Sequence, residues 1–258
     1  MIAKLCFKVW KFTFSQSYSF TISQSLILFY TTDIKDNIAT LTNEEALHCT
    51  RTLRKRIGDT IFMVDGQGGF YQGKILSTHK KVCTIAIEKT LESNQKRPYK
   101  IHIAIAPTKN ISRFEWFLEK ATEIGIDEIT PLLCRHSERK KIRLDRLEKI
   151  LIAAMKQSLK TNLPKINPLT TFSTFLQTKR TESCFIAHCQ ADNNFHLKEK
   201  YQPNQNVLIL IGPEGDFSST EIATAIKQGF QPVTLGQSRL RTETAGIVAC
   251  HVVALMNS

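Results

Sequence analysis

Two glycine-containing segments in the C-terminal half of the chain combine residue types that bind ligands. The first is Leu210–Phe217 (LIGPEGDF), which ends an apolar run, and the second is Leu235–Gly246 (LGQSRLRTETAG). Gly212 and Gly215 let the backbone approach a ligand closely, because they carry no side chain, and each segment leads into an expected helix. Ligands of open α/β sheets bind beyond the carboxyl ends of strands, so we expect the two loops to share one pocket.

The common phosphate-binding and nucleophile motifs are absent from both segments. Neither contains the Gly-Lys-Ser/Thr of a Walker loop, and neither contains a G-x-S-x-G elbow. The glycines at 66, 68 and 69 join two expected strands, so we interpret them as a hairpin turn and not as a dinucleotide fingerprint, which must open a helix. Either segment taken alone is also explained by turn geometry and helix capping.

Cysteine usage predicts neither a disulfide framework nor a metal site. The seven cysteines are scattered and form no C-x-x-C pair, which fits a reducing compartment. His188 and Cys189 are adjacent, but without a second pair at ligand spacing we interpret them as buried strand residues. We therefore expect no metal. The cysteines are Cys6, Cys49, Cys83, Cys134, Cys184, Cys189 and Cys250.

Short alternating segments predict a small β-barrel with one helix over residues 26–92. The polar stretch Glu92–Pro98 is the expected linker, and residues 1–25 form an acid-free extension of doubtful relevance. The expected strands are Leu26–Tyr30, Ile38–Leu41, Thr60–Val64, Phe70–Ser77 and Val82–Glu88, and the expected helix is Glu44–Arg54.

Strands alternate with helices over residues 98–258, which predicts an α/β domain with a mostly parallel sheet covered on both faces. Two capping boxes are expected to begin helices, Ser112 with Glu115 and Ser218 with Glu221. The expected strands are Ile101–Ala106, Glu128–Leu133, Ser183–His188, Val207–Ile211 and Gln231–Leu235. The expected helices are 112–124, 144–159, 218–228 and 242–255.

The chain carries 35 Lys plus Arg against 23 Asp plus Glu, a formal net charge of +12. The excess is spread over all parts of the chain, so a basic tail does not explain it. Charge alone fits a solvated basic surface as well as a polyanionic partner. No apolar run approaches the ~20 residues that span a bilayer, which predicts no membrane association.

Three segments taken together are specific enough to indicate a protein family. LIGPEGDF, LRTETA and RFEWFLEKATEIGIDEITPL (Arg113–Leu132) resemble the RsmE family of S-adenosylmethionine-dependent methyltransferases, which act on N3 of a uridine in 16S ribosomal RNA. The resemblance runs from about Leu26 to the C-terminus. It implies a PUA-like barrel followed by a SPOUT-class α/β domain with a C-terminal trefoil knot, a homodimer, and a cytoplasmic enzyme that acts on RNA, within the small ribosomal subunit.

The resemblance also implies which residues form the cofactor site. Backbone groups of the two loops would read the adenine edge, and apolar side chains would cover its ring. His188, at the end of an earlier strand, would belong to a third loop, as a pocket wall or a general base. The implied residues are Leu210, Ile211, Gly212, Glu214, Gly215, Leu235, Gly236, Leu240, Arg241, Thr242, Thr244 and Ala245.

Methylation of uridine N3 requires a catalyst that favours the deprotonated base. We assign to Arg241 the stabilisation of the negative charge on the carbonyl oxygens of the base. Glu243 would accept the proton or orient Arg241, and its alternative role is a favourable charge at a helix N-terminus. Candidate phosphate contacts are Arg51, Arg54 and Arg56 in the barrel, and Arg113, Arg135, Arg139, Lys140 and Lys141 in the larger domain.

Two departures from the family pattern stand out. Asp216 occupies a position where the family usually has glycine, and the basic residue expected at the start of the barrel is missing. Two other functions remain open at this stage. One is a SPOUT enzyme with another RNA target, and the other is a non-catalytic RNA-binding factor in ribosome assembly.

Overall fold

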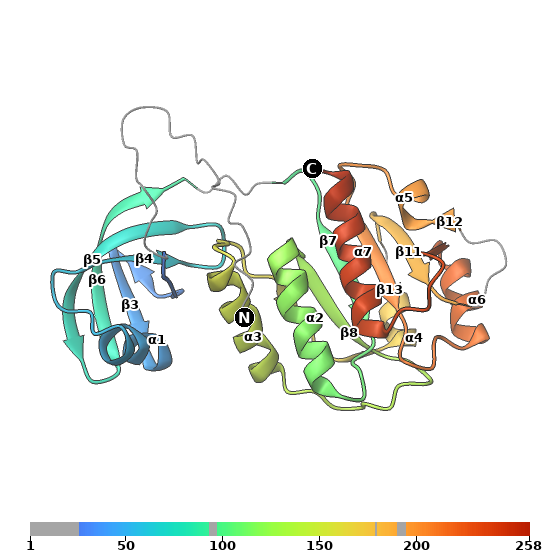
Figure 1. Ribbon diagram of the computed structural model, residues 1–258, viewed down its shortest axis with the longest axis horizontal. Coiled ribbons are helices and arrows are strands. Elements are labelled where there is room, and N and C mark those ends of the chain that lie inside the picture. The colour runs from blue at the N-terminus through green and yellow to red at the C-terminus, as the bar shows by residue number, and fades with distance from the viewer. Residues whose placement is uncertain (1–25, 93–96, 179, 190–194) are drawn as a thin grey trace, which may run out of the picture.

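The computed structural model describes residues 26–92, 97–178, 180–189 and 195–258 (Figure 1). A sheet-rich N-terminal unit lies at the left of Figure 1, and an α/β unit lies to its right. The predicted extension at residues 1–25 and most of the predicted linker lie outside the described residues. Within the described part of the chain, no helix is both long and apolar enough to cross a membrane.

The N-terminal unit is a six-stranded sheet whose two edges are joined at one residue. Its strand order is β1-β4-β5-β6-β3-β2. Thr31 lies between the two edge strands: its N–H donates to Val64 O at 3.1 Å and its hydroxyl donates to Thr40 O at 2.6 Å. These two bonds link Thr31 to β4 near one edge of the sheet and to β3 near the other, which fits the predicted small barrel. Its strands are β1 (Leu28–Tyr30), β2 (Ile34–Lys35), β3 (Ile38–Thr42), β4 (Thr60–Val64), β5 (Phe70–His79) and β6 (Val82–Leu91).

The C-terminal unit is built on a wholly parallel sheet. Its strand order is β10-β8-β7-β13-β11-β14-β12, and β9 pairs with β8. Every residue of the central strand β13 is buried, because helices cover both faces of the sheet. The strands are β7 (Ile101–Ile105), β8 (Glu128–Leu133), β9 (Lys165–Ile166), β10 (Thr170–Thr171), β11 (Ser183–Ala187), β12 (Phe195–His196), β13 (Val207–Ile211) and β14 (Gln231–Thr234).

Alternate residues of β13 belong to two separate cores. Ile209 packs with α2, α3, α5 and α7, whereas Leu208 packs with α4 and α6 on the opposite face. In Figure 1, α2 and α7 lie side by side in front of the sheet, where Gly246 allows close contact, because a Cβ there would lie 2.7 Å from the Phe117 ring. The helices are α2 (Ile111–Ile124), α3 (Leu144–Gln157), α4 (Phe172–Leu176), α5 (Leu197–Lys200), α6 (Ser219–Lys227) and α7 (Thr242–Met256).

Three helix predictions need correction at their ends. The first helix of the α/β unit is capped by Asn110, whose side chain accepts from the N–H of Ser112, so the predicted capping box is wrong and Glu115 pairs with Arg146 instead. Asn caps as well as Ser, and it lies closer to the strand. Leu159 lies beyond the end of α3, with φ of 54°. The expected helix 44–54 is α1 (Asn43–Leu47) followed by a π-helical turn, η1 (His48–Thr52).

The barrel packs against α3 and the residues that follow it. Leu28, Val64 and Met155 form a buried apolar cluster shared by the two units. At the centre of the contact, Glu45 accepts from the Lys156 ammonium through Oε1 and from the Tyr30 N–H through Oε2, at 3.2 Å for the latter. These two charged side chains are only 19% and 18% exposed, so their pairing fixes one unit on the other.

Glu45→Gln tests this junction. The substitution removes the carboxylate and leaves the Lys156 ammonium unpaired in a half-buried place, so we expect the free energy of unfolding in urea to fall by about 1–2 kcal/mol. Glu44→Gln is the matched control, because Glu44 and Lys149 form an ion pair whose side chains are 77% and 63% exposed, so water screens it and its loss is expected to change stability little. Equal losses for the two variants would show that Glu45 is not central to the junction.

Candidate functional site

Three loops that the sequence singled out leave the same edge of the parallel sheet. β11 lies between β13 and β14 in the sheet, and the three strands run in one direction. Their carboxyl ends therefore lie together. The loops begin at His188 after β11, at Gly212 after β13 and at Leu235 after β14. This is the edge at which open α/β sheets bind ligands, as the sequence predicted.

A buried hydrogen bond joins the second loop to the third. The hydroxyl of Thr242, at the start of α7, donates to the carbonyl oxygen of Gly212 at 3.1 Å, and Thr242 is only 6% exposed. A side chain at Gly212 would be crowded, because a Cβ there would lie 3.1 Å from both the ring and the N–H nitrogen of Phe217. The two loops, which were predicted to share one site, are therefore in direct contact.

Neighbouring loops support the turn formed by Gly212–Asp216. The carboxylate of Glu214 accepts from the backbone N–H of Lys109, in the loop after β7, at 2.8 Å. The Nδ1 of His136, in the loop after β8, lies 3.1 Å from the carbonyl oxygen of Gly215. The turn is thus fixed from two sides by loops that follow adjacent strands, which leaves its own backbone preorganised for a ligand.

His188 lies at the wall of this site. It is 9% exposed, and burial lowers the pKa of its imidazole, while the charge of Asp216 opposes that shift. A neutral imidazole at neutral pH can accept a proton. Both roles left open by the sequence, pocket wall and general base, are therefore chemically available.

Arg241 and Glu243 flank Thr242, but one is exposed and the other is buried. Arg241 is exposed at the N-terminal end of α7. Glu243 is 5% exposed, and its Oε1 lies 3.8 Å from Nε of Arg113 on α2. Its Oε2 is buried and has no hydrogen-bond partner among the described residues. The ion pair with Arg113, and not one with Arg241, is therefore the charge contact of Glu243.

The other predicted cofactor residues lie at the same edge. Gly236 is exposed with φ of 134°, and a Cβ on it would meet no atom within 4 Å, so its backbone faces open space. Leu210 and Ile211 are buried at the end of β13, Leu235 and Leu240 are half-buried in the loop after β14, and Thr244 and Ala245 are half-buried in the first turn of α7.

The predicted phosphate contacts fall into two groups. Those on the barrel are exposed in and after the π-helical turn, and those on the α/β unit follow β8 or begin α2. Arg139 is the exception, because its guanidinium donates to the carbonyl oxygens of Thr108 and Lys109, at 3.0 Å for the first, and so supports a loop of the protein itself. The exposed members are Arg51, Arg54, Arg56, Arg135, Lys140 and Lys141, and Arg113 is half-buried.

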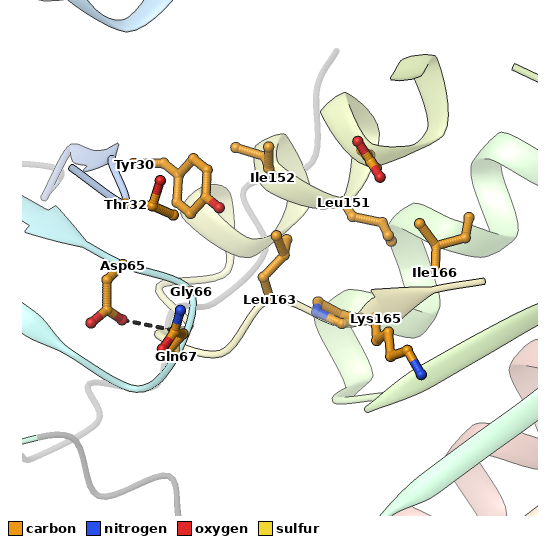
Figure 2. A pocket seen from close by; sticks show the side chains of 12 residues that line it. Tyr30, Thr32, Asp65, Gly66, Gln67, Leu151, Ile152, Leu163, Lys165 and Ile166 are labelled. Carbon is orange, nitrogen blue, oxygen red and sulfur yellow. Dashed lines mark hydrogen bonds between the residues drawn. The ribbon is translucent and has the colours of Figure 1, made fainter. Parts of the chain in front are cut away.

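A cavity of about 400 Å³ lies elsewhere, between the barrel and the α/β unit (Figure 2). Tyr30 and Asp65 face it from the barrel, and Leu151 and Leu163 face it from the other unit. The carboxylate of Asp65 already accepts from two N–H groups and the Tyr71 hydroxyl. We therefore place the candidate site at the three loops and not in this cavity.

Sequence reasoning missed the loop after β7, residues 106–110. Its Lys109 N–H binds Glu214, and its Thr108 and Lys109 carbonyl oxygens accept from Arg139. The available signal was an apolar strand followed by a short loop and an Asn cap, APTKN. Among the described residues, no three His, Cys, Asp or Glu side chains gather to form a metal site, and the six cysteines there are free thiols.

Family models match both units of the chain. A model described as an RNA methyltransferase domain matches residues 95–254, and one described as an RNA methyltransferase PUA domain matches residues 41–88. Ribosomal RNA small subunit methyltransferase E of Buchnera aphidicola is 30% identical over 223 residues, which is 84% of this chain and 87% of that protein.

Solved structures share the fold over nearly the whole chain. A Porphyromonas gingivalis protein described as a probable rRNA-methyltransferase has a TM-score of 0.84 and 42% identity, covering 90% of this chain and 98% of its own. Ribosomal RNA small subunit methyltransferase E from Neisseria gonorrhoeae, bound to S-adenosyl methionine, has a TM-score of 0.80 and 25% identity, covering 90% and 98%.

Thr242→Val tests the bond between the two loops. Valine has the shape of threonine but cannot donate to Gly212 O, so a buried carbonyl loses its partner and we expect the free energy of unfolding to fall by about 1–2 kcal/mol. Thr242→Ser keeps the hydroxyl and is expected to lose less. If Ser destabilises the protein more than Val in urea titrations, packing and not the hydrogen bond explains the role of Thr242.

His188 gives stability a pH dependence of known sign. The pKa of its imidazole is lower in the folded protein than in the unfolded chain, so the unfolded chain binds the proton more readily. The resulting contribution to stability is present above the ordinary histidine pKa and is lost as the pH falls. The unfolding free energy is measured at pH 7.5 and pH 5.5, two convenient assay points on either side of the ordinary histidine pKa of about 6.5. We expect the difference between the two values to be smaller in His188→Gln than in the unsubstituted protein. An unchanged difference would contradict this.

Proposed function

Because the chain belongs to the ribosomal RNA small subunit methyltransferase E family, we propose that it methylates N3 of a specific uridine in 16S ribosomal RNA with S-adenosylmethionine as the methyl donor. The family match makes the chain an rRNA methyltransferase of PUA-like and SPOUT-like architecture. The choice of uridine N3 rests on the RsmE motifs of the sequence. The observation that carries the proposal is the convergence of the three loops at one edge of the sheet, with two of them joined by the Thr242–Gly212 bond.

The loops fit S-adenosylmethionine in three respects. The backbone at Gly236 faces open space, so a planar ring can approach it closely. Apolar residues at the end of β13 and half-buried leucines after β14 provide surface for the ring. The unpartnered Oε2 of Glu243 lies in the first turn of α7, next to Thr242, and a cationic ligand suits a buried carboxylate. We assign the binding of the methyl donor to the predicted cofactor residues, which are His188, Leu210, Ile211, Gly212, Glu214, Gly215, Leu235, Gly236, Leu240, Arg241, Thr242, Thr244 and Ala245.

The protein must favour loss of the N3 proton from the target uridine. When bound, S-adenosylmethionine supplies an electrophilic methyl group. Arg241 is exposed at the mouth of the loops, where its guanidinium can stabilise negative charge on the carbonyl oxygens of the base. The neutral imidazole of His188 and the carboxylate of Glu243 are the two groups that can accept the proton. The N3–C bond forms as the sulfonium–methyl bond breaks, so positioning of the base supplies much of the rate.

RNA is proposed to contact both units. The exposed arginines after α1 and the exposed cations after β8 offer phosphate contacts on either side of the junction between the units. The Glu45–Lys156 pair keeps these two groups at a fixed separation. The target base must leave its stack to reach the loops.

Four further properties belong to the proposal. We propose barrel and catalytic domains at residues 26–92 and 98–258, a trefoil knot formed by the loops of the last strands, a homodimer, and cytoplasmic action on the small ribosomal subunit. Half-buried apolar residues of α7, such as Val248 and Val252, provide surface for a two-fold contact. A position of β13 between the earlier strands β7 and β11 suits a knotted topology.

The decisive assay is methyl transfer from radiolabelled S-adenosylmethionine to small-subunit RNA from cells that lack the enzyme, followed by mapping of the methylated base. We expect label on N3 of one uridine. Label on another base would favour a SPOUT enzyme with a different target. Absence of S-adenosylmethionine binding in calorimetry would favour the non-catalytic RNA-binding factor.

Arg241→Ala tests the proposed catalytic role. Loss of the guanidinium removes charge stabilisation that is needed only during methyl transfer, so we expect kcat to fall by about 100-fold and the Kd for S-adenosylmethionine to change by less than about threefold. Arg239→Ala is the matched control, because Arg239 is an exposed arginine of the same loop. Full turnover by Arg241→Ala would refute the role of Arg241.

A further inference from the structure

Asp216 departs from the family pattern and also has an unusual backbone conformation. Its φ is 61°, in the left-handed region that favours glycine, and its N–H closes the turn by donating to Pro213 O at 2.9 Å. This conformation explains why the family usually has glycine here. Aspartate tolerates it better than most residues, because its short carboxylate can accept hydrogen bonds from nearby backbone.

The carboxylate of Asp216 binds two backbone N–H groups from different loops. Oδ1 accepts from Phe217 at 2.8 Å, within the turn after β13, and Oδ2 accepts from Cys189 at 2.9 Å, in the loop after β11. Glycine has no side chain with which to form either bond. In this chain, the side chain of Asp216 therefore ties the turn after β13 to the end of β11.

The fold does not require the bond to Cys189. Cys189 is exposed, so water can satisfy its N–H if the carboxylate is removed. The turn itself is also fixed from the other side, where Nδ1 of His136 lies 3.0 Å from the carbonyl oxygen of Asp216. What the Asp216 carboxylate adds is a fixed position for the backbone of His188 and Cys189 relative to that turn.

We propose that Asp216 is a positioning residue that clamps two walls of the S-adenosylmethionine site together, the end of β11 and the Gly212–Asp216 turn. The inference rests on the proposed function, since it concerns the same site. A clamped site loses less conformational freedom when it binds its ligand, so removal of the clamp weakens binding. In this chain the Asp216 carboxylate therefore holds the two walls of the site together, whereas glycine at this position would leave them unconnected.

Asp216→Gly tests the clamp directly, because glycine accepts the left-handed backbone without strain. We expect its Kd for S-adenosylmethionine, measured by calorimetry on the full chain, to rise about 5- to 10-fold. Asp216→Asn retains one acceptor that can reach the Cys189 N–H, and its Kd is expected to lie between those of Asp216→Gly and the unsubstituted protein. Exchange of the Cys189 amide hydrogen, followed without cofactor, is expected to be faster in Asp216→Gly.

Asn204→Gly is the matched control, because Asn204 is exposed and also has a positive φ, 63°, outside the three loops. It makes the same exchange to glycine at a positive φ and adds similar flexibility to the unfolded chain, but it removes no bond between the loops, so its Kd for S-adenosylmethionine is expected to stay unchanged. If Asp216→Gly binds S-adenosylmethionine within twofold of the unsubstituted protein, the clamp is refuted. If the unsubstituted protein itself fails to bind, the proposed function is refuted instead.

Discussion

The buried hydrogen bond from the Thr242 hydroxyl to the Gly212 carbonyl oxygen is the contact on which the candidate site depends. It joins the start of the last helix to the turn after β13, which are not consecutive in the chain. The parallel sheet makes this possible, because β13, β11 and β14 all end at one edge. Phe217 packs so closely against Gly212 that a side chain there would crowd it. Core packing therefore fixes the positions of the loops, and their backbone groups remain available to bind a ligand.

Only a few contacts are needed to explain how the two units are joined. A small apolar cluster and the Glu45–Lys156 pair place the barrel on α3. Because both charges are mostly buried and Glu45 also accepts from the Tyr30 backbone, the pair specifies an orientation as well as a contact. Basic side chains lie on both units, so a fixed orientation defines one path for a polyanion. The chain has a net charge of +12, and this junction determines where the basic side chains of the two units lie relative to each other.

Strand positions were largely predictable, because each buried strand is a short apolar run with turn residues at its ends. Val207–Ile211 and Glu128–Leu133 match β13 and β8. The short elements β2, β9, β10, β12, α4 and α5 were not predicted, since two to five residues carry no recognisable period. The Asn110 cap was missed because Ser112 and Glu115 offered a competing signal.

The two loops were found from glycine and polar residues, but their contacts were not, because Asp216–Cys189 and Glu214–Lys109 join residues far apart in sequence. The partner of Glu243 required the packing of α2 on α7.

Backbone amide shifts measured by nuclear magnetic resonance during a titration with S-adenosylmethionine test the central claim most directly. The claim is that the cofactor binds at the three loops. Gly212, Gly215 and Gly236 lie in those loops, whereas Gly66 lines the cavity between the two units. The account predicts large shifts at Gly212, Gly215 and Gly236 and little change at Gly66. Large shifts at Gly66, with the loop glycines unchanged, would contradict it.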